Sequence, residues 1–398
     1  MSGTRGRRSL IMREPAEWFD AIVLGGGPAG AAAATMMARA GMQTLVVDQT
    51  ASARAAVGEA LPPAAKPVLR ELGVWDRLEG DGHRRSHGND SAWAESTLRA
   101  THFLRDPNGH GWHLDRARFD TLLRRTAEDA GASVRMATVA HALVRTIDGW
   151  RVTLGNDGTS AEVNARWLLD CTGRRGWAAR RTGAVRACDD RLIAIASLFT
   201  PACGDDGDAD LDSMTLVESA PDGWWYTARL PAGSRIVVYL TDARDPSAAR
   251  ARTRQGFSRM VDETRHVRAR LARRQYVSAG APRVAAAGTS RLIRPAGDGW
   301  VAAGDAAMSC DPLSSQGILT ALDSGMRAAA AIRAQLDGDR SAFERYRAHV
   351  DAVYAAHLRN KREYYTYEQR WVDRPFWARR QHRDRIEPAS HQAGAAFA

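Results

Sequence analysis

The chain has 398 residues, of which 44% are hydrophobic, and its 56 basic and 46 acidic residues give a formal net charge of +10. This length favours two interleaved domains over one small core. No stretch approaches the roughly 20 apolar residues of a membrane-spanning helix, and the N-terminal apolar run is too short for a signal peptide, so we expect a cytoplasmic protein with no membrane span.

The positive charge is almost entirely arginine, with Lys66 and Lys361 as the only lysines. We expect the excess to be spread along the chain as a solvated surface, because no basic run is interleaved with aromatic residues as in nucleic-acid-binding modules. A patch that docks an acidic partner or an anionic substrate stays open. The four cysteines are widely spaced and the acidic stretch 205–210 lacks the glutamate of a calcium loop, which predicts no disulfide framework and no metal site.

Residues 1–16 form a basic tail that we expect to be flexible. The most informative motif of the sequence follows directly after this tail. Apolar residues 21–24 run into Gly25-Gly26-Gly27-Pro28-Ala29-Gly30, an alanine-rich segment follows, and a second apolar run ends at Asp48. This order of strand, glycine turn, helix, strand and acid is typical of a dinucleotide-binding unit. Gly25 allows the tight turn, Gly27 lets the backbone approach a pyrophosphate, and Gly30 lets the helix pack on the strand. Asp48 would accept a hydrogen bond from a ribose hydroxyl.

Changes of pattern along the chain predict the domain boundaries. Segments with short strands and turn signals interrupt the dinucleotide-binding pattern, which predicts an α/β protein: a Rossmann-like domain with an inserted substrate domain on an antiparallel sheet and a helical C-terminus. Asp115 is a plausible N-cap of a helix that buries Phe119, Leu122 and Leu123. The expected parts are the dinucleotide-binding domain (17–83, 115–185 and 291–345), the substrate domain (84–114 and 186–290), a C-terminal helical region (346–389) and a flexible tail (390–398).

A second motif near the C-terminal end identifies the dinucleotide. Residues 299–303 read as a buried strand that ends at Gly304-Asp305, and residues 311–316 lead into a helix that begins near Gly317. A nicotinamide dehydrogenase does not need this second half-site. FAD does, because the Asp305 carboxylate can bind the ribityl chain while the helix start presents N–H groups to the pyrimidine edge of the flavin. The two motifs together predict FAD.

Five motifs then occur in a fixed order: Gly-Glu-Ala-Leu-Pro-Pro (58–63), Gly-Trp-His-Leu-Asp-Arg-Ala-Arg-Phe-Asp (111–120), Asp-Cys-Thr-Gly-Arg-Arg (170–175), Asp-Gly-Trp-Trp-Tyr-Thr-Ala-Arg-Leu-Pro (222–231) and Asp-Pro-Leu-Ser-Ser-Gln-Gly-Ile (311–318). With them the chain resembles the flavin-dependent monooxygenases of the para-hydroxybenzoate hydroxylase fold, over residues 18–385. Within that fold it looks most like the halogenase-related branch, which includes LodB-like flavoproteins that help to build tryptophylquinone cofactors.

The resemblance implies roles for particular residues. Glu59 lies in the family's loop that reaches toward the flavin, either as an active-site carboxylate or as a turn residue. The residues that the resemblance assigns to FAD are Gly25, Gly27, Pro28, Ala29, Gly30 and Asp48 for the ADP half, Arg116, and Gly304, Asp305, Pro312, Gly317 and Ile318 for the ribityl chain and isoalloxazine.

Two differences from the flavin halogenases bear on which reaction we expect. Flavin halogenases carry a lysine over the substrate pocket, but Lys66 falls in the helix after the double proline and Lys361 lies near the C-terminus. They also carry a W-x-W-x-I-P motif, whereas Trp224, Trp225 and Tyr226 lack that spacing. Halogenation thus loses its two best markers.

We therefore expect an FAD-dependent monooxygenase that uses O2, through a flavin C4a-hydroperoxide, to hydroxylate an indole or phenol, with a tryptophan of a partner protein or peptide as one candidate. NAD(P)H reduces the flavin directly or through a separate flavin reductase. The alternatives are a flavin halogenase and a non-catalytic flavoprotein chaperone.

Four residues are candidates for the chemistry besides the cofactor ligands. Trp224 and Trp225 could roof the ring together with Tyr226, but adjacent strand residues face opposite sides, so only one set can reach it. Glu59 is the candidate carboxylate. His113 is either an acid/base beside the pocket or a structural histidine.

Overall fold

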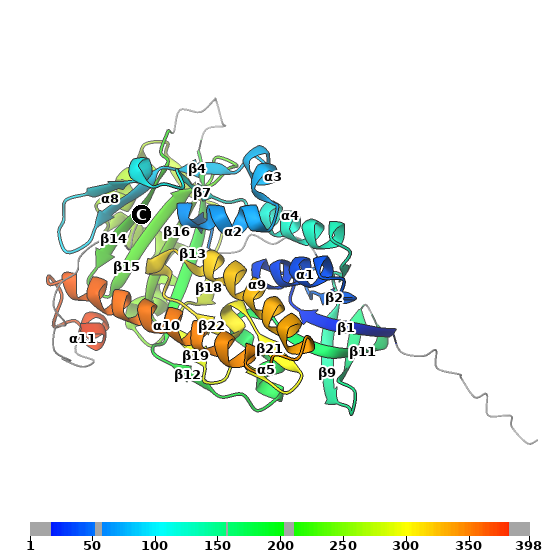
Figure 1. Ribbon diagram of the computed structural model, residues 1–398. Coiled ribbons are helices and arrows are strands. Elements are labelled where there is room, and N and C mark those ends of the chain that lie inside the picture. The colour runs from blue at the N-terminus through cyan, green and yellow to red at the C-terminus, as the bar shows by residue number, and fades with distance from the viewer. Residues whose placement is uncertain (1–16, 52–57, 157, 203–210, 382–398) are drawn as a thin grey trace, which may run out of the picture.

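Two large sheets dominate the computed structural model, which describes residues 17–51, 58–156, 158–202 and 211–381 (Figure 1). The two expected tails, 1–16 and 390–398, and the acidic stretch 205–210 lie outside these residues. Within the described ranges, no helix combines the length and the apolarity that crossing a bilayer requires.

The first sheet contains the strand–helix–strand unit that the glycine motif predicts. Strand β1 (Glu17–Leu24) pairs in parallel with β2 (Thr44–Val47), and helix α1 (Pro28–Arg39) connects them. The alanines at 31–34 are buried, which lets α1 lie close to the sheet. The other strands of this sheet are β8 (Ser133–Arg135), β9 (Val139–Arg145), β10 (Trp150–Asn156), β11 (Thr159–Asp170), β20 (Ala296–Gly297) and β21 (Trp300–Ala302).

The carboxyl ends of three parallel strands meet at one edge of this sheet. Leu24 at the end of β1 pairs with Asp170 at the end of β11, and Asp170 pairs with Ala302 at the end of β21. The loops that follow these strands therefore lie side by side, at the edge where open α/β sheets bind their ligands.

The second sheet is largely antiparallel and joins two segments of the chain. Strands β15 (Gly223–Arg229) and β16 (Arg235–Asp242) form an antiparallel hairpin, and β5 (Gly88–Ala92) extends the sheet by a parallel pairing with β14 (Met214–Ala220). The predicted α/β fold class is confirmed. The remaining strands of this sheet are β6 (Arg99–His102), β13 (Leu192–Pro201), β17 (Tyr276–Ser278) and β18 (Arg283–Ala286).

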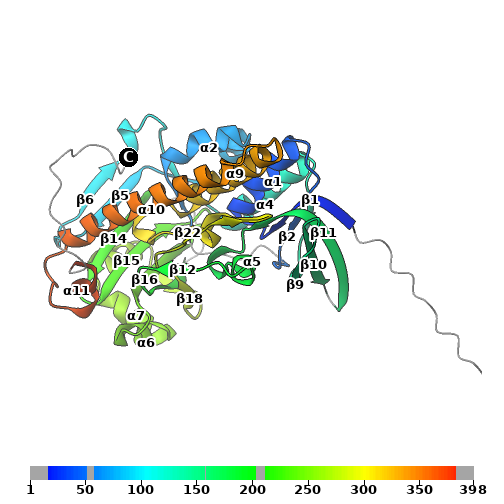
Figure 2. The same cartoon turned by 60° about the horizontal axis from the view of Figure 1, so that its bottom comes forward.

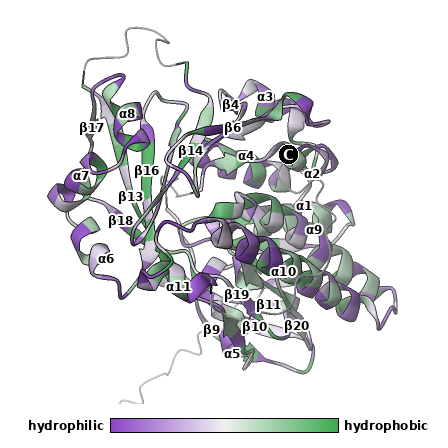
Figure 3. Ribbon diagram, turned by 90° about the vertical axis from the view of Figure 1, so that its left-hand side faces the viewer, coloured by the Kyte–Doolittle hydropathy of each residue, from purple (hydrophilic) through white to green (hydrophobic). Residues whose placement is uncertain are grey.

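Helices and two small sheets cover these layers. Figures 2 and 3 show α6 (Pro246–Ala251) and α7 (Arg254–Asp262) on the side of the second sheet that faces away from α1. The other helices are α2 (Lys66–Glu71), α3 (Trp75–Gly80), α4 (Arg116–Asp129), α5 (Trp177–Arg181), α8 (His266–Ala272), α9 (Gly317–Leu336), α10 (Ala342–Tyr367) and α11 (Pro375–Gln381), and the small sheets contain β3 (Ala60–Leu61), β4 (Arg84–Ser86) and β7 (Gly111–His113), and β12 (Arg186–Cys188), β19 (Ser290–Leu292) and β22 (Met308–Ser309).

Helix α10 contacts both large sheets. At its start, the Tyr346 hydroxyl donates a hydrogen bond to the Ala302 carbonyl of β21 (2.7 Å). Near its end, Tyr365 accepts a hydrogen bond from the Trp224 indole of β15 (3.0 Å). The helix runs along the molecule between these points (Figure 1).

Asp115 caps α4 as predicted, because its carboxylate accepts a hydrogen bond from the Arg118 backbone (3.1 Å). Replacing Asp115 with alanine leaves that N–H without its partner, so we expect the free energy of unfolding to fall by about 1 kcal/mol, measured by urea denaturation. Asp115→Asn keeps an acceptor and should stay close to the parent. An equal loss in both variants would instead assign the effect to the Asp115–Arg118 ion pair (3.7 Å).

Candidate active site

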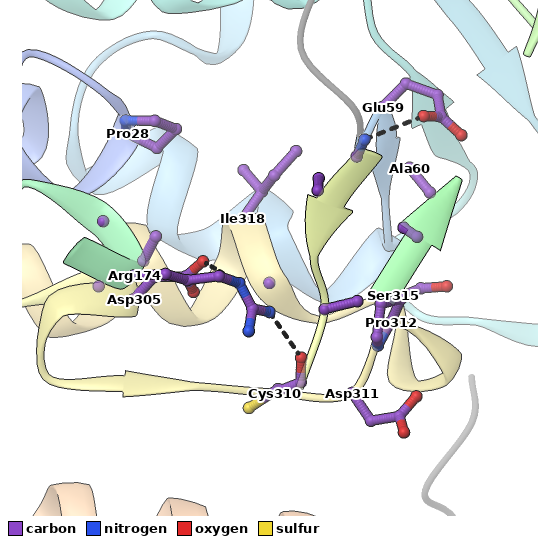
Figure 4. Close-up of a pocket in the computed structure, with 18 of the residues that line it drawn as sticks. Pro28, Glu59, Ala60, Arg174, Asp305, Cys310, Asp311, Pro312, Ser315 and Ile318 are labelled. Carbon is purple, nitrogen blue, oxygen red and sulfur yellow. Dashed lines mark hydrogen bonds and ion pairs between the residues drawn. The ribbon is translucent and has the colours of Figure 1, made fainter. Parts of the chain in front are cut away.

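A cavity of about 390 Å³ lies between the carboxyl edge of the first sheet and the inner face of the second (Figure 4). This volume is typical of ligand and cofactor pockets. The sheet edge and helix starts contribute Gly27, Pro28, Ala29, Arg116, Gly173, Arg174, Gly304, Asp305, Pro312, Gly317 and Ile318, and the opposite wall contributes Glu59, Ala194, Thr215, Val217, Trp224, Tyr226, Leu240 and residues 285–287.

The first glycine turn is packed so that side chains cannot be added at two of its positions. Gly25 has a φ of +106°, and a Cβ there would overlap the Cys171 carbonyl. A Cβ on Gly30 would overlap the Gly25 carbonyl, whereas one on Gly27 would meet nothing within 4 Å and would point into open space. The Asp48 carboxylate accepts a hydrogen bond from the Gly26 backbone (2.6 Å) and fixes the turn to the end of β2. Its contact with a ribose stays a prediction.

The Gly304-Asp305 motif lies against the first glycine turn, as the sequence predicts. Gly304 has a φ of +61°, and a Cβ there would lie 2.8 Å from the Ala29 Cβ. Asp305 forms an ion pair with Arg174 (3.3 Å) (Figure 4), and burial raises the pKa of its carboxyl although Arg174 lowers it. Sequence reasoning did not single out Arg174, although it follows the glycine turn at the end of β11.

Glu59 is a buried carboxylate in the wall of the cavity. Its Oε2 atom accepts hydrogen bonds from the Gly58 backbone (3.2 Å) and the Tyr226 hydroxyl (3.3 Å), while Oε1 has no partner among the described residues. Burial raises the pKa of Glu59, and these hydrogen bonds and the charge of Arg116 oppose the rise. Arg116 donates to the Gly58 carbonyl (2.8 Å) and pairs with Asp120 (3.1 Å), so it holds the loop that carries Glu59.

The alternation along β15 decides which aromatic side chains reach the cavity. Trp224 and Tyr226 line it, whereas Trp225 lies on the opposite face, with its ring centroid 4.6 Å from that of Tyr239 and 5.2 Å from that of Phe257. Trp225, a candidate catalytic residue from the sequence, is therefore corrected to a core residue beneath α6–α8. Behind Trp224, the Tyr365 hydroxyl that accepts its indole N–H donates to Asp311 (3.1 Å).

His113 lies one side chain behind the wall. It is fully buried, and its Nε2 atom is 2.8 Å from the hydroxyl of Thr215, which itself lines the cavity. Burial, together with the charge of Arg235, lowers the pKa of His113 to about 4, so the ring is neutral at pH 7. This position favours the structural interpretation over the acid/base one.

Neither lysine lines the cavity. The Lys66 ammonium lies 4.6 Å from the centroid of the Trp75 ring, and Lys361 pairs with Asp189 (2.7 Å) and Asp190. No group of three or more metal-binding side chains occurs in the part of the chain that the structure describes.

The arrangement fits FAD. The glycine turn and the start of α1 form a cradle for a pyrophosphate, Asp305 and the start of α9 lie next to it in the same cavity, and Glu59 lines that cavity as well.

Comparison with known proteins agrees with this fit. A family model described as an FAD binding domain matches residues 19–361. The chain is 26% identical over 378 residues to LodB of Marinomonas mediterranea, whose name describes an FAD-dependent oxidoreductase, covering 94% of this chain and 100% of LodB.

Two solved structures share the fold. The myxobacterial chondrochloren halogenase CndH matches with a TM-score of 0.82 and 24% identity, over 92% of this chain and 86% of that one. The peptidyl tryptophan dihydroxylase QhpG, described as essential for tryptophylquinone cofactor biogenesis, matches with a TM-score of 0.70 and 27% identity, over 95% and 81%. The chain belongs to the FAD binding domain family and is an FAD-dependent enzyme whose relatives include an oxidoreductase and halogenases.

Proposed function

We propose that this protein is an FAD-dependent monooxygenase that hydroxylates an electron-rich aromatic ring, an indole or a phenol. The observation that carries the proposal is the composition of the cavity wall opposite the FAD cradle. It contains the buried carboxylate of Glu59 beside Trp224 and Tyr226, and both lysines of the chain lie elsewhere. A wall of this kind suits a proton-accepting role toward a bound ring and lacks the lysine that the halogenases use.

Bound FAD in its reduced form supplies two electrons, so that with two protons one atom of O2 enters the ring and the other leaves as water. The reductant is NAD(P)H, acting directly or through a flavin reductase. The side chains of Trp224, Val217 and Leu240 would exclude water and hold the substrate ring against the bound flavin. The Glu59 carboxylate accepts the proton of the indole N–H or phenol O–H when the ring is hydroxylated.

The similarity to QhpG supports a tryptophan of a partner protein or peptide as the substrate, because that relative is named a peptidyl tryptophan dihydroxylase. A free indole or phenol is the alternative within the same reaction.

Product analysis with isotopically labelled O2 tests the proposal. We expect the reduced enzyme to convert an indole, a phenol or a tryptophan-containing peptide to a product that carries one labelled oxygen atom, with no halide present. Reoxidation to hydrogen peroxide with every such compound, without labelled product, would contradict hydroxylation.

Halogenation is the second candidate, and the fold shared with CndH favours it. The same assay separates the two reactions, because a halogenase gives a halogenated product only when chloride or bromide is added.

A further inference from the structure

The helices α6, α7 and α8 lie on the outer face of the second sheet (Figure 3), and their sequence is rich in arginine. Residues 243–275, here named the arginine layer, contain ten arginines and only three acidic residues. Most of the net charge of +10 is thus concentrated in one short part of the chain, which corrects the expectation that the excess is spread along the chain.

Many arginines of this layer differ from the ion-paired arginines of α9. On α9, Arg327 pairs with Asp323 (2.9 Å) and Arg333 pairs with Asp337 (3.0 Å), so their charges are largely neutralised. In the arginine layer, six exposed side chains form no hydrogen bond or ion pair with any described residue: Arg244, Arg252, Arg259, Arg265, Arg268 and Arg273. The layer therefore presents unneutralised positive charge to its surroundings.

The packing of the layer keeps these charges on its outer side. Helix α8 buries Val267 and Leu271 against the sheet, so that Arg268 lies on its outer face, and Arg265, the residue before the helix, is exposed as well. Helix α7 buries Phe257 in the same way. Like charges held close together repel one another, and a surface of opposite charge relieves that repulsion and is attracted over a distance.

The chain next to the layer favours a polypeptide over a nucleic acid as the partner. The layer continues directly into β17 and β18, where Val277 and Val284 are 49% and 47% exposed. Among the described strands, β18 pairs only with β13, so its other edge offers backbone hydrogen bonds. Peptides bind through apolar contacts and strand pairing, whereas the phosphate backbone of a nucleic acid makes no favourable contact with a valine side chain. Ala285 and Ala286 of the same strand line the cavity.

We infer that the arginine layer and the free edge of β18 form a docking surface for an acidic polypeptide that delivers its aromatic ring to the cavity. The delivery rests on the proposed function, whereas the docking itself is a binding event that needs no turnover.

A binding measurement with matched variants tests the inference. The probe is a fluorescent synthetic peptide with one tryptophan flanked by glutamates, titrated with FAD-loaded protein at low salt and followed by fluorescence anisotropy. The layer variant carries R252Q, R259Q, R268Q and R273Q. The control carries R125Q, R151Q, R166Q and R180Q, which remove the same charge from exposed arginines outside the layer.

We expect the layer variant to bind the glutamate peptide about tenfold more weakly than the parent, and the control to stay within about twofold. A peptide with glutamine in place of glutamate should bind more weakly to the parent. Equal loss in both variants, no loss in the layer variant, or equally tight binding of a DNA duplex would overturn the inference. Circular dichroism and the flavin absorbance show that the variants are folded. If the peptide docks but is never hydroxylated, the docking surface stands and the proposed reaction fails.

Discussion

Gly30→Ala is expected to abolish the retention of FAD. A Cβ at this position would overlap the Gly25 carbonyl oxygen and lie 3.1 Å from the Val23 Cγ1 atom, so α1 would have to move away from β1. That movement displaces the N–H groups at the start of α1, which are the donors for the pyrophosphate. Overpacking of this kind costs about 1–3 kcal/mol and more where backbone is involved, which corresponds to a loss of about five- to 150-fold in affinity or greater.

The measurement is the flavin absorbance that remains after gel filtration, followed by titration with FAD. Gly80→Ala is the matched control, because a Cβ there meets nothing within 4 Å and α3 lies outside the cavity wall. A Gly30→Ala protein that stays yellow and binds FAD like the parent would show that this turn does not hold the pyrophosphate.

Glu59→Gln is expected to retain FAD and to lose about a hundredfold or more in the rate of hydroxylation, because an amide of the same shape cannot accept the substrate proton. The carboxylate is the active form, and burial raises its pKa. Activity of the parent therefore falls as the pH drops through that raised pKa, at a higher pH than for an ordinary glutamate. Glu59→Gln should lack this acidic limb in its profile of kcat against pH.

Tyr226→Phe provides the control for this prediction. It removes a hydrogen bond that lowers the pKa of Glu59, so the acidic limb should move to higher pH with a smaller loss of rate. A Glu59→Gln enzyme with the rate and pH profile of the parent would make Glu59 the turn residue that the sequence left as its alternative.

The parts of this protein that could be predicted from sequence are those fixed by local geometry or by the cofactor. The turn at Gly25 and Gly30 and the cap at Asp115 depend on a few neighbouring residues. The contact between Gly304 and Ala29 joins distant segments, yet it was predictable because one cofactor needs both half-sites.

The parts that could not be predicted depend on packing between distant elements. Alternation along β15 separates Trp224 from Trp225, but only the helices that cover one face determine which of them reaches the cavity. The burial of His113 follows from the pairing of β7 with β3 and β4, and the partner of Asp305 is Arg174 from another strand end. The unneutralised arginines were missed because ion pairing is a property of the folded surface.

The contacts of helix α10 with both large sheets bear on how large substrates can enter the cavity. Because α10 is hydrogen-bonded to Ala302 of the first large sheet at one end and to Trp224 of the second at the other, it links the two sheets. A movement that separates the two sheets would therefore have to break at least one of these hydrogen bonds. We accordingly expect rings carried on slender, extended supports to enter the cavity more readily than bulky, compact ones.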